Sequence, residues 1–153
     1  MTPIQRFSLS ALRKSGEDPY KGPISAVLRD GEPVGTVLDG AVLEAQYEIG
    51  GAFLLLVSDD CPYEETLHAY LIDEQGKVLD RADLGYAYTS GVLRNIKVTG
   101  EDTLEFEFTG SSLYRLVVHS RPRRFWNASG GAGEILRFPA GRRIQITREA
   151  SHG

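Results

Sequence analysis

The residues whose types and spacing could do chemistry are concentrated between Ser58 and His68. Four carboxylates fall within Asp59–Glu65, beside a proline, a tyrosine and the only cysteine of the chain, Cys61. Clustered carboxylates make a compact anionic surface that attracts a basic partner. Cys61 also precedes His68 by seven residues, and an imidazole close to a thiol can lower the thiol pKa and activate a nucleophile.

Reactive side chains are few elsewhere. The histidines are His68, His119 and His152, and none belongs to a His-x-x-x-His or His-Glu-x-x-His arrangement, which would place metal ligands on one helical face. No nucleophile signature surrounds Cys61, and a lone cysteine is commonly a small buried apolar side chain. We therefore expect no catalytic residue, no metal site and no cofactor, with His68 and His119 on the outward faces of their strands.

The most distinctive basic segment is Arg121–Asn127, in which three arginines lie beside a phenylalanine and the single tryptophan. Guanidinium groups neutralise phosphates, and aromatic rings stack on exposed bases. The whole chain is nevertheless acidic, with a pI near 5.4, and it contains neither a zinc finger nor the aromatic motif of RNA-recognition domains. We therefore favour a structural role for this segment over nucleic-acid binding. The glycine-rich Ser129–Glu134 lacks a following Lys-Ser or Lys-Thr pair, so no phosphate loop is predicted.

The elements that must position these residues belong to one ordinary globular domain. With 153 residues, 41% of them hydrophobic and 25% charged, the chain is long enough to bury a core without a disulfide or a metal ion. A single cysteine excludes an internal disulfide and fits a reducing compartment. The longest apolar run, Ala52–Val57, is too short to span a bilayer. We predict one domain over residues 1–153 with a polar tail at 149–153, located in the cytoplasm and away from membranes.

The net charge of −4 is distributed unevenly. Residues 1–109 carry a charge of −10, whereas residues 110–153 carry +6. The favoured interpretation is that basic C-terminal strands lie beside acidic strands and neutralise them within the domain. The alternative is that the asymmetry steers a charged partner.

Alternation of apolar and polar residues predicts antiparallel strands along most of the chain. It is clearest in Thr103–Thr109, where three large apolar side chains share one face. Further strands are predicted at Ser25–Leu28, Gly35–Leu38, Val42–Glu48, Phe53–Val57, Leu67–Ile72, Val78–Leu84, Val92–Val98, Leu113–His119, Glu134–Phe138 and Arg143–Thr147. The short separators, rich in glycine and aspartate, predict hairpin turns and leave no room for crossover helices. We predict a mostly β fold with little helix, an antiparallel meander that forms a β-sandwich or a barrel-like single domain.

Three segments are predicted to differ from a half-buried strand. Phe53–Val57 is apolar without alternation, which predicts a central strand that is covered on both faces and pairs with Leu67–Ile72. Ser58–Thr66 is then an exposed connection. We expect Phe7–Lys14 to form one or two helical turns.

Residues 53–120 resemble small uncharacterised bacterial β-rich proteins of the kind found as immunity partners in toxin loci. The resemblance is carried by Thr66–Gly85, Gly91–Val98, the Leu-x-Phe-x-Phe strand at Leu104–Phe108, and Leu113–Val118. It implies a protein that works by binding, in which a rigid β-scaffold covers or distorts the site of a toxin. It transfers no catalytic residue.

We therefore expect a non-enzymatic protein-binding module, an immunity protein that neutralises a cognate bacterial toxin. The expected partner-binding residues are acidic and tyrosine side chains in two loops: Asp59, Asp60, Tyr63, Glu64, Glu65, Tyr86 and Tyr88. Tyrosine is included because it supplies a large contact area at a small cost in side-chain entropy. The alternative is a small-molecule-binding β-barrel, or a small hydrolase that uses Cys61, His68 or His119.

Overall fold

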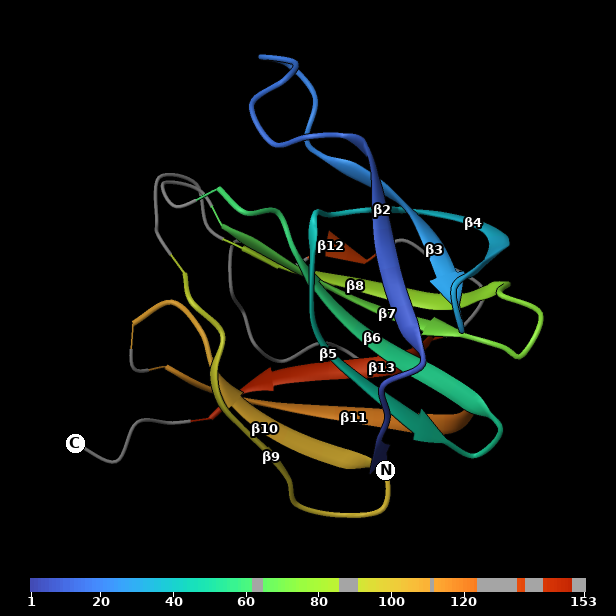
Figure 1. The fold of residues 1–153 in the computed structure, drawn as a ribbon. Coiled ribbons are helices and arrows are strands. Elements are labelled where there is room, and N and C mark those ends of the chain that lie inside the picture. The colour runs from blue at the N-terminus through green and yellow to red at the C-terminus, as the bar shows by residue number, and fades with distance from the viewer. Residues whose placement is uncertain (62–64, 86–90, 111, 124–134, 137–141, 150–153) are drawn as a thin grey trace.

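The fold consists of strands joined by turns and loops (Figure 1). The computed structural model describes residues 1–61, 65–85, 91–110, 112–123, 135–136 and 142–149, and no helix is found among them. None of these residues belongs to a helix able to cross a membrane. The strands pair throughout in antiparallel fashion and form three sheets, so the prediction of an antiparallel, mostly β protein is confirmed.

The central sheet has six strands in the order β1-β5-β6-β7-β8-β12. Their bounds are β1 Thr2–Pro3, β5 Val42–Ile49, β6 Ala52–Ser58, β7 Thr66–Ile72, β8 Val78–Gly85 and β12 Ile135–Leu136. Strands β5 to β8 follow one another as a meander, and the predicted pairing of β6 with β7 is confirmed by a register that places Leu55 opposite Tyr70.

Two smaller sheets complete the fold. A three-stranded sheet has the order β2-β3-β4, and a four-stranded sheet has the order β13-β11-β10-β9. The bounds of these strands are β2 Phe7–Arg13, β3 Ile24–Arg29, β4 Glu32–Asp39, β9 Arg94–Val98, β10 Thr103–Glu107, β11 Leu113–Arg123 and β13 Arg142–Arg148.

The three sheets are stacked as layers, with the six-stranded sheet in the middle (Figure 1). One of its faces packs Leu54, Leu56 and Leu71 against the four-stranded sheet, which contributes Phe106 and Ile146 to this core. The other face carries a second core, shared with the three-stranded sheet: Phe7, Val27, Leu38, Phe53, Leu55, Val57, Tyr70 and Ile72. The arrangement is therefore an open, layered sandwich in the described part of the chain.

Strand β6 lies at the centre of the fold, because its apolar side chains pack against another layer on each face of the sheet. All of its residues from Ala52 to Ser58 are buried. Successive side chains of a strand point to opposite faces, so an uninterrupted apolar run requires a packed layer on each side. The predicted covering of this strand on both faces is confirmed.

The predicted helical turns at Phe7–Lys14 are wrong, because this segment forms strand β2. Phe7, Leu9 and Ala11 alternate with Ser8 and Ser10, which is the period of a strand with one face on a core. The ring of Phe7 meets that of Phe53 edge-on, with centroids 5.0 Å apart. Burial of this ring against the central sheet therefore holds the segment extended.

A buried carboxylate, Asp80 of β8, links the central sheet to the four-stranded sheet. One of its oxygens accepts the backbone N–H groups of Arg143 and Ile144 at 2.7 and 2.8 Å, and the guanidinium of Arg142 approaches the same oxygen at 3.6 Å. On the outer face, Arg115 pairs with Glu105 at 3.0 Å. Basic C-terminal strands thus lie beside acidic ones, as the favoured interpretation of the charge distribution predicts.

Several edges of the sheets are irregular. The register between β2 and β3 shifts between Ala11 and Arg13, and that between β9 and β10 shifts near Asn95, whose φ is +53°. Strand β4 contains Pro33 and a Gly35 with φ of +80°. These strands lie at the margins of the outer sheets, where irregular backbone interrupts the ladder of exposed N–H and C=O groups.

Candidate functional site

The ends of strands β6, β7 and β8 carry a set of charged side chains on the face that the three-stranded sheet covers. The register places His68 of β7 directly opposite Asp83 of β8, and Tyr70 opposite Arg81. Because every second residue of a strand shares a face, these four side chains gather on one side of the sheet. Asp59 reaches them from the loop that follows β6, and Asp39 reaches them from the end of β4.

His68 is the centre of this charge network, which comprises Asp39, Asp59, His68, Arg81 and Asp83. Its Nε2 lies 2.7 Å from Asp59 Oδ1, and its Nδ1 lies 2.8 Å from Asp83 Oδ1. A carboxylate only accepts hydrogen bonds, so both ring nitrogens carry a proton and the side chain is an imidazolium. Burial of His68, which is 5% exposed, lowers its pKa, but the hydrogen bonds and charges of the two carboxylates outweigh burial and raise the pKa to about 9.

Arg81 extends the network towards the end of β4. Its Nε and Nη2 donate to the two oxygens of Asp83 at 2.8 and 2.9 Å, and its Nη1 donates to Asp39 at 2.6 Å. Arg81 Nη2 also lies 3.3 Å from His68 Nδ1. This contact is not a hydrogen bond, because both nitrogens are donors, and each of them bonds the Asp83 carboxylate. Burial opposes ionisation of Asp83, but bonds from His68 and Arg81 lower its pKa to about 2.

The aromatic ring of Tyr70 lies against the guanidinium of Arg81. The Arg81 guanidinium lies 5.1 Å from the centre of the Tyr70 ring, a distance at which the cation and the ring attract each other. The Tyr70 hydroxyl accepts a hydrogen bond from the backbone N–H of Asp39 at 3.0 Å. Burial raises the pKa of this phenol, so it stays neutral.

Hydrogen bonds to the buried side chain of Glu65 hold the first residues of the loop after β6. The Glu65 carboxylate, only 8% exposed, accepts the backbone N–H groups of Asp59 at 2.6 Å and of Cys61 at 3.0 Å. Burial raises the pKa of Glu65, and these backbone bonds oppose the rise. Asp60 lies between them with an exposed side chain and a φ of +56°.

The structure places the expected site residues in different environments. Asp60 is exposed, whereas Asp59 and Glu65 direct their carboxylates inward, so Ser58–Thr66 is not the wholly exposed connection that we expected. Four of the expected contact residues lie outside the described residues: Tyr63, Glu64, Tyr86 and Tyr88.

The two described histidines are not brought together. The expectation that His68 points outward is wrong, because the three-stranded sheet covers that face of β7. His119 belongs to the four-stranded sheet on the opposite side of the central layer, and it bonds Gln145 on a neighbouring strand at 2.9 Å. Within the described residues, no three side chains of His, Cys, Asp or Glu are grouped as metal ligands would be.

Three members of the site were not predicted from the sequence: Asp39, Arg81 and Asp83. In the segment Arg81–Leu84 charged and apolar residues alternate, which is typical of a strand with a solvated face. The available signal was the predicted β7–β8 hairpin, which sets His68 opposite Asp83 once its register is known. No protein-family model matches the chain, and comparison with curated proteins and with solved structures gave no match.

Proposed function

We propose that the protein is a non-enzymatic protein-binding module, and specifically an immunity protein that neutralises a cognate bacterial toxin in the cytoplasm. The observation that supports this proposal is the set of buried hydrogen bonds that holds the loop after β6. Asp59 is bonded to the buried His68, and Glu65 holds the backbone of Asp59 and Cys61. These bonds hold the backbone of Asp59 and Cys61 in place before any partner arrives, with the Asp60 side chain exposed between them.

A loop that is already ordered loses little conformational freedom when it binds, so more of the contact energy appears as affinity. Its outward carboxylate also favours a basic partner surface, and rim charges raise the rate of encounter. Toxins that act on nucleic acids or nucleotides have basic sites of this kind, because their substrates are polyanions. An anionic loop on a rigid sheet therefore suits the blocking of such a site.

The charge network also argues against the alternative of a hydrolase built on Cys61 and His68. A general base needs a ring nitrogen that is free to take a proton. Both nitrogens of His68 already carry protons and face carboxylates. The network instead does what a structural ion cluster does, which is to join the loop, strands β7 and β8, and the end of β4.

The test uses the product of the gene adjacent to that of this protein in its native genome. We expect that product to arrest growth when it is expressed alone, and co-expression of this protein to restore growth. The two proteins should also co-purify in a fixed ratio. In purified form, we expect Asp60→Lys to weaken the complex at least tenfold and Asp60→Asn to weaken it less, because asparagine tolerates the positive φ while losing the charge.

Glu74→Lys is the matched control. Glu74 is also an exposed carboxylate in a loop, but it lies in the β7–β8 turn at the opposite end of β7. This variant should bind as the unmodified protein does. If neither adjacent product arrests growth or binds, the toxin-neutralising role is refuted; if the complex forms and Asp60→Lys binds normally, the proposed contact surface is wrong.

A further inference from the structure

The two longest strands of the four-stranded sheet part from each other near one end of the molecule. Val118 of β11 pairs with Ile144 of β13, and the next pair is Arg123 with Arg142. Four residues of β11 therefore stand opposite a single residue, Arg143. The extra length bows out of the ladder, as in an extended bulge, and such bulges commonly redirect side chains at binding sites.

A pocket of about 610 Å³ lies in the concavity beside this bulge. It is lined by residues of β11 and β13 and by two turns, the β5–β6 turn at Gly50 and the β9–β10 turn at Asp102. Its volume is within the range of about 300 to 1,000 Å³ that is typical of pockets for small ligands. Elements from two layers thus form its walls.

Three arginines line this pocket: Arg121, Arg123 and Arg143. The Nε of Arg143 donates to the backbone oxygen of His119 at 2.9 Å, which fixes the direction of that guanidinium. In the part of the chain that the structure describes, neither Arg121 nor Arg123 has a side-chain hydrogen bond or an ion pair. None of the described residues therefore competes with a ligand for their donors.

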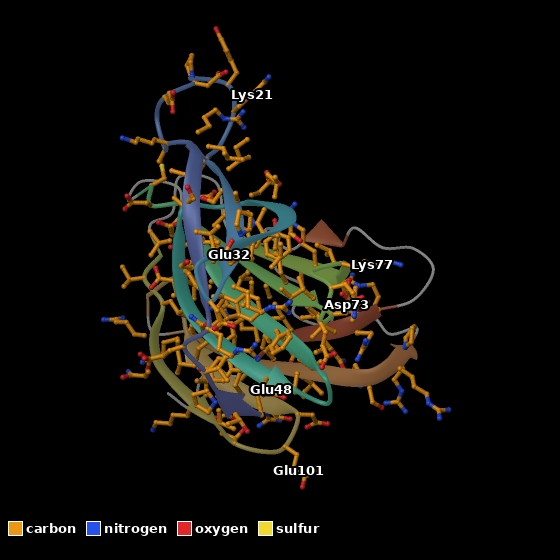
Figure 2. All side chains as sticks on the ribbon, turned by 45° about the vertical axis from the view of Figure 1, so that its right-hand side comes forward. Lys21, Glu32, Glu48, Asp73, Lys77 and Glu101 are labelled. Atoms are coloured by element: carbon orange, nitrogen blue, oxygen red, sulfur yellow. The ribbon has the colours of Figure 1, made fainter. Side chains whose placement is uncertain are left out.

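The acidic residues of the lining do not neutralise these arginines. Asp102 accepts a hydrogen bond from the Thr103 hydroxyl at 2.7 Å. Glu101 is exposed, and Figure 2 shows its side chain directed away from the body of the molecule. No ion pair joins either carboxylate to the three arginines among the residues described. With three arginines against two carboxylates, the described lining keeps a net positive charge.

We propose that this pocket binds the phosphate group of a small phosphorylated molecule. A phosphate monoester presents three terminal oxygens, and planar guanidinium groups match them with paired N–H donors. A carboxylate has two oxygens, which a single arginine can satisfy. The lining carboxylates of Glu101 and Asp102 repel an extended polyanion such as RNA more strongly than a single phosphate group, because RNA carries many more charges. This site is independent of the partner-binding loop and does not rest on the proposed function.

Calorimetric titration of the full chain at low ionic strength tests the proposal. The ligands are inorganic phosphate, ribose 5-phosphate, adenosine monophosphate, citrate and a single-stranded RNA of twelve nucleotides. We expect saturable binding of at least one of the three phosphate compounds, tighter than that of citrate or of the RNA. Inorganic phosphate separates recognition of the phosphate group alone from recognition of a phosphorylated sugar or nucleotide.

The double variant Arg121→Gln, Arg123→Gln should weaken this binding at least tenfold. Both residues are exposed, so the variant should keep the thermal unfolding curve of the unmodified protein. Its matched control is Lys14→Gln, Lys21→Gln, which removes the same charge from the projecting β2–β3 hairpin, where Figure 2 labels Lys21. Absence of phosphate binding, equal loss in the control, or tighter binding of citrate or RNA would each overturn the proposal.

Discussion

His68 holds a positive charge inside the protein because two carboxylates surround it. Removal of an imidazolium from water is costly, and only its paired bonds to Asp59 and Asp83 recover that cost. The charge network therefore makes the free energy of folding depend on the protonation of His68. Its effect on stability has a definite direction with pH.

Stability should fall as the pH rises from about 6.5 to about 9. The pKa of His68 is raised from 6.5 to about 9 in the folded protein, so its contribution is complete below the unfolded value and is lost as the pH passes the folded one. The loss is on the order of 3 kcal/mol in the free energy of unfolding. Urea titrations at pH 6 and pH 9.5 measure it.

His68→Gln should remove most of this alkaline loss, whereas His119→Gln should retain it, because His119 bonds a neutral amide on the outer sheet. An unchanged alkaline slope in His68→Gln would contradict the assignment. On the acid side the pKa of Asp83 is lowered from 3.8 to about 2, so its contribution is present above pH 3.8 and is lost as the pH falls through 2.

At the scale of elements, Asp80 acts as a clamp between β8 and β13. It is fully buried and accepts two backbone N–H groups from the opposing layer, where Arg142 also depends on its charge. Asp80→Ala leaves these donors and a buried cation without that partner. We expect the free energy of unfolding to fall by about 3 to 5 kcal/mol, measured by chemical denaturation.

Asp30→Asn is the control for this clamp, because asparagine removes the charge and tolerates the φ of +52° at this position. Asp30 also pairs with an arginine, Arg6, at 3.2 Å, but both side chains are largely exposed. A surface pair of this kind contributes at most about 1 kcal/mol. Equal losses in the two variants would show that the clamp adds nothing beyond an ordinary ion pair.

Gly40 sets the tight passage from β4 to β5. Its φ is +127°, its N–H donates to the carbonyl of Pro23 at 2.9 Å, and a Cβ added there would collide with the side chain of Val57. Gly40→Ala should therefore destabilise the protein by about 2 kcal/mol or more, through backbone strain and overpacking together. Thermal unfolding measures the effect.

Gly16→Ala separates these two causes. Gly16 has a φ of +79° and no atom within 4 Å of an added Cβ, so only backbone strain of about 1 to 2 kcal/mol applies. If Gly40→Ala costs no more than Gly16→Ala, the collision with Val57 is relieved by movement of the chain.

The strands could be predicted from sequence wherever local alternation agrees with the side that is buried. Thr103–Glu107 shows this, because its apolar positions all face one core. The charge network could not be predicted, since it depends on which layer covers β7. That choice is made by Phe7 and Leu38, far from His68 in the chain, and no local pattern reports such a contact. Strand β1 was not predicted, because a strand of two residues is too short to show an alternation of apolar and polar side chains.

At the scale of the whole molecule, the two cores differ in size. Counting described residues alone, the core between the central and four-stranded sheets contains 17 buried residues, and the core beneath the three-stranded sheet contains 8. The free energy of local opening depends on the apolar area that is exposed. The three-stranded sheet should therefore detach before the other two layers separate.

Native-state hydrogen exchange tests this order. We expect backbone amides of β3 to exchange at least tenfold faster than those of β6, although each strand is paired on both sides. Phe7→Ala should speed exchange in β3 further while leaving β6 nearly unchanged. Equal protection of β3 and β6 would show that the three layers open as a single unit.

The irregular margins of the outer sheets have a consequence for the protein at high concentration. A straight, regular margin is a template on which another copy can add its own strand. The proline of β4, the shifted register of β2 and the left-handed Asn95 of β9 each break that template. Among the residues described, these three irregular margins therefore oppose the seeding of fibres built from copies of the protein in a crowded cell.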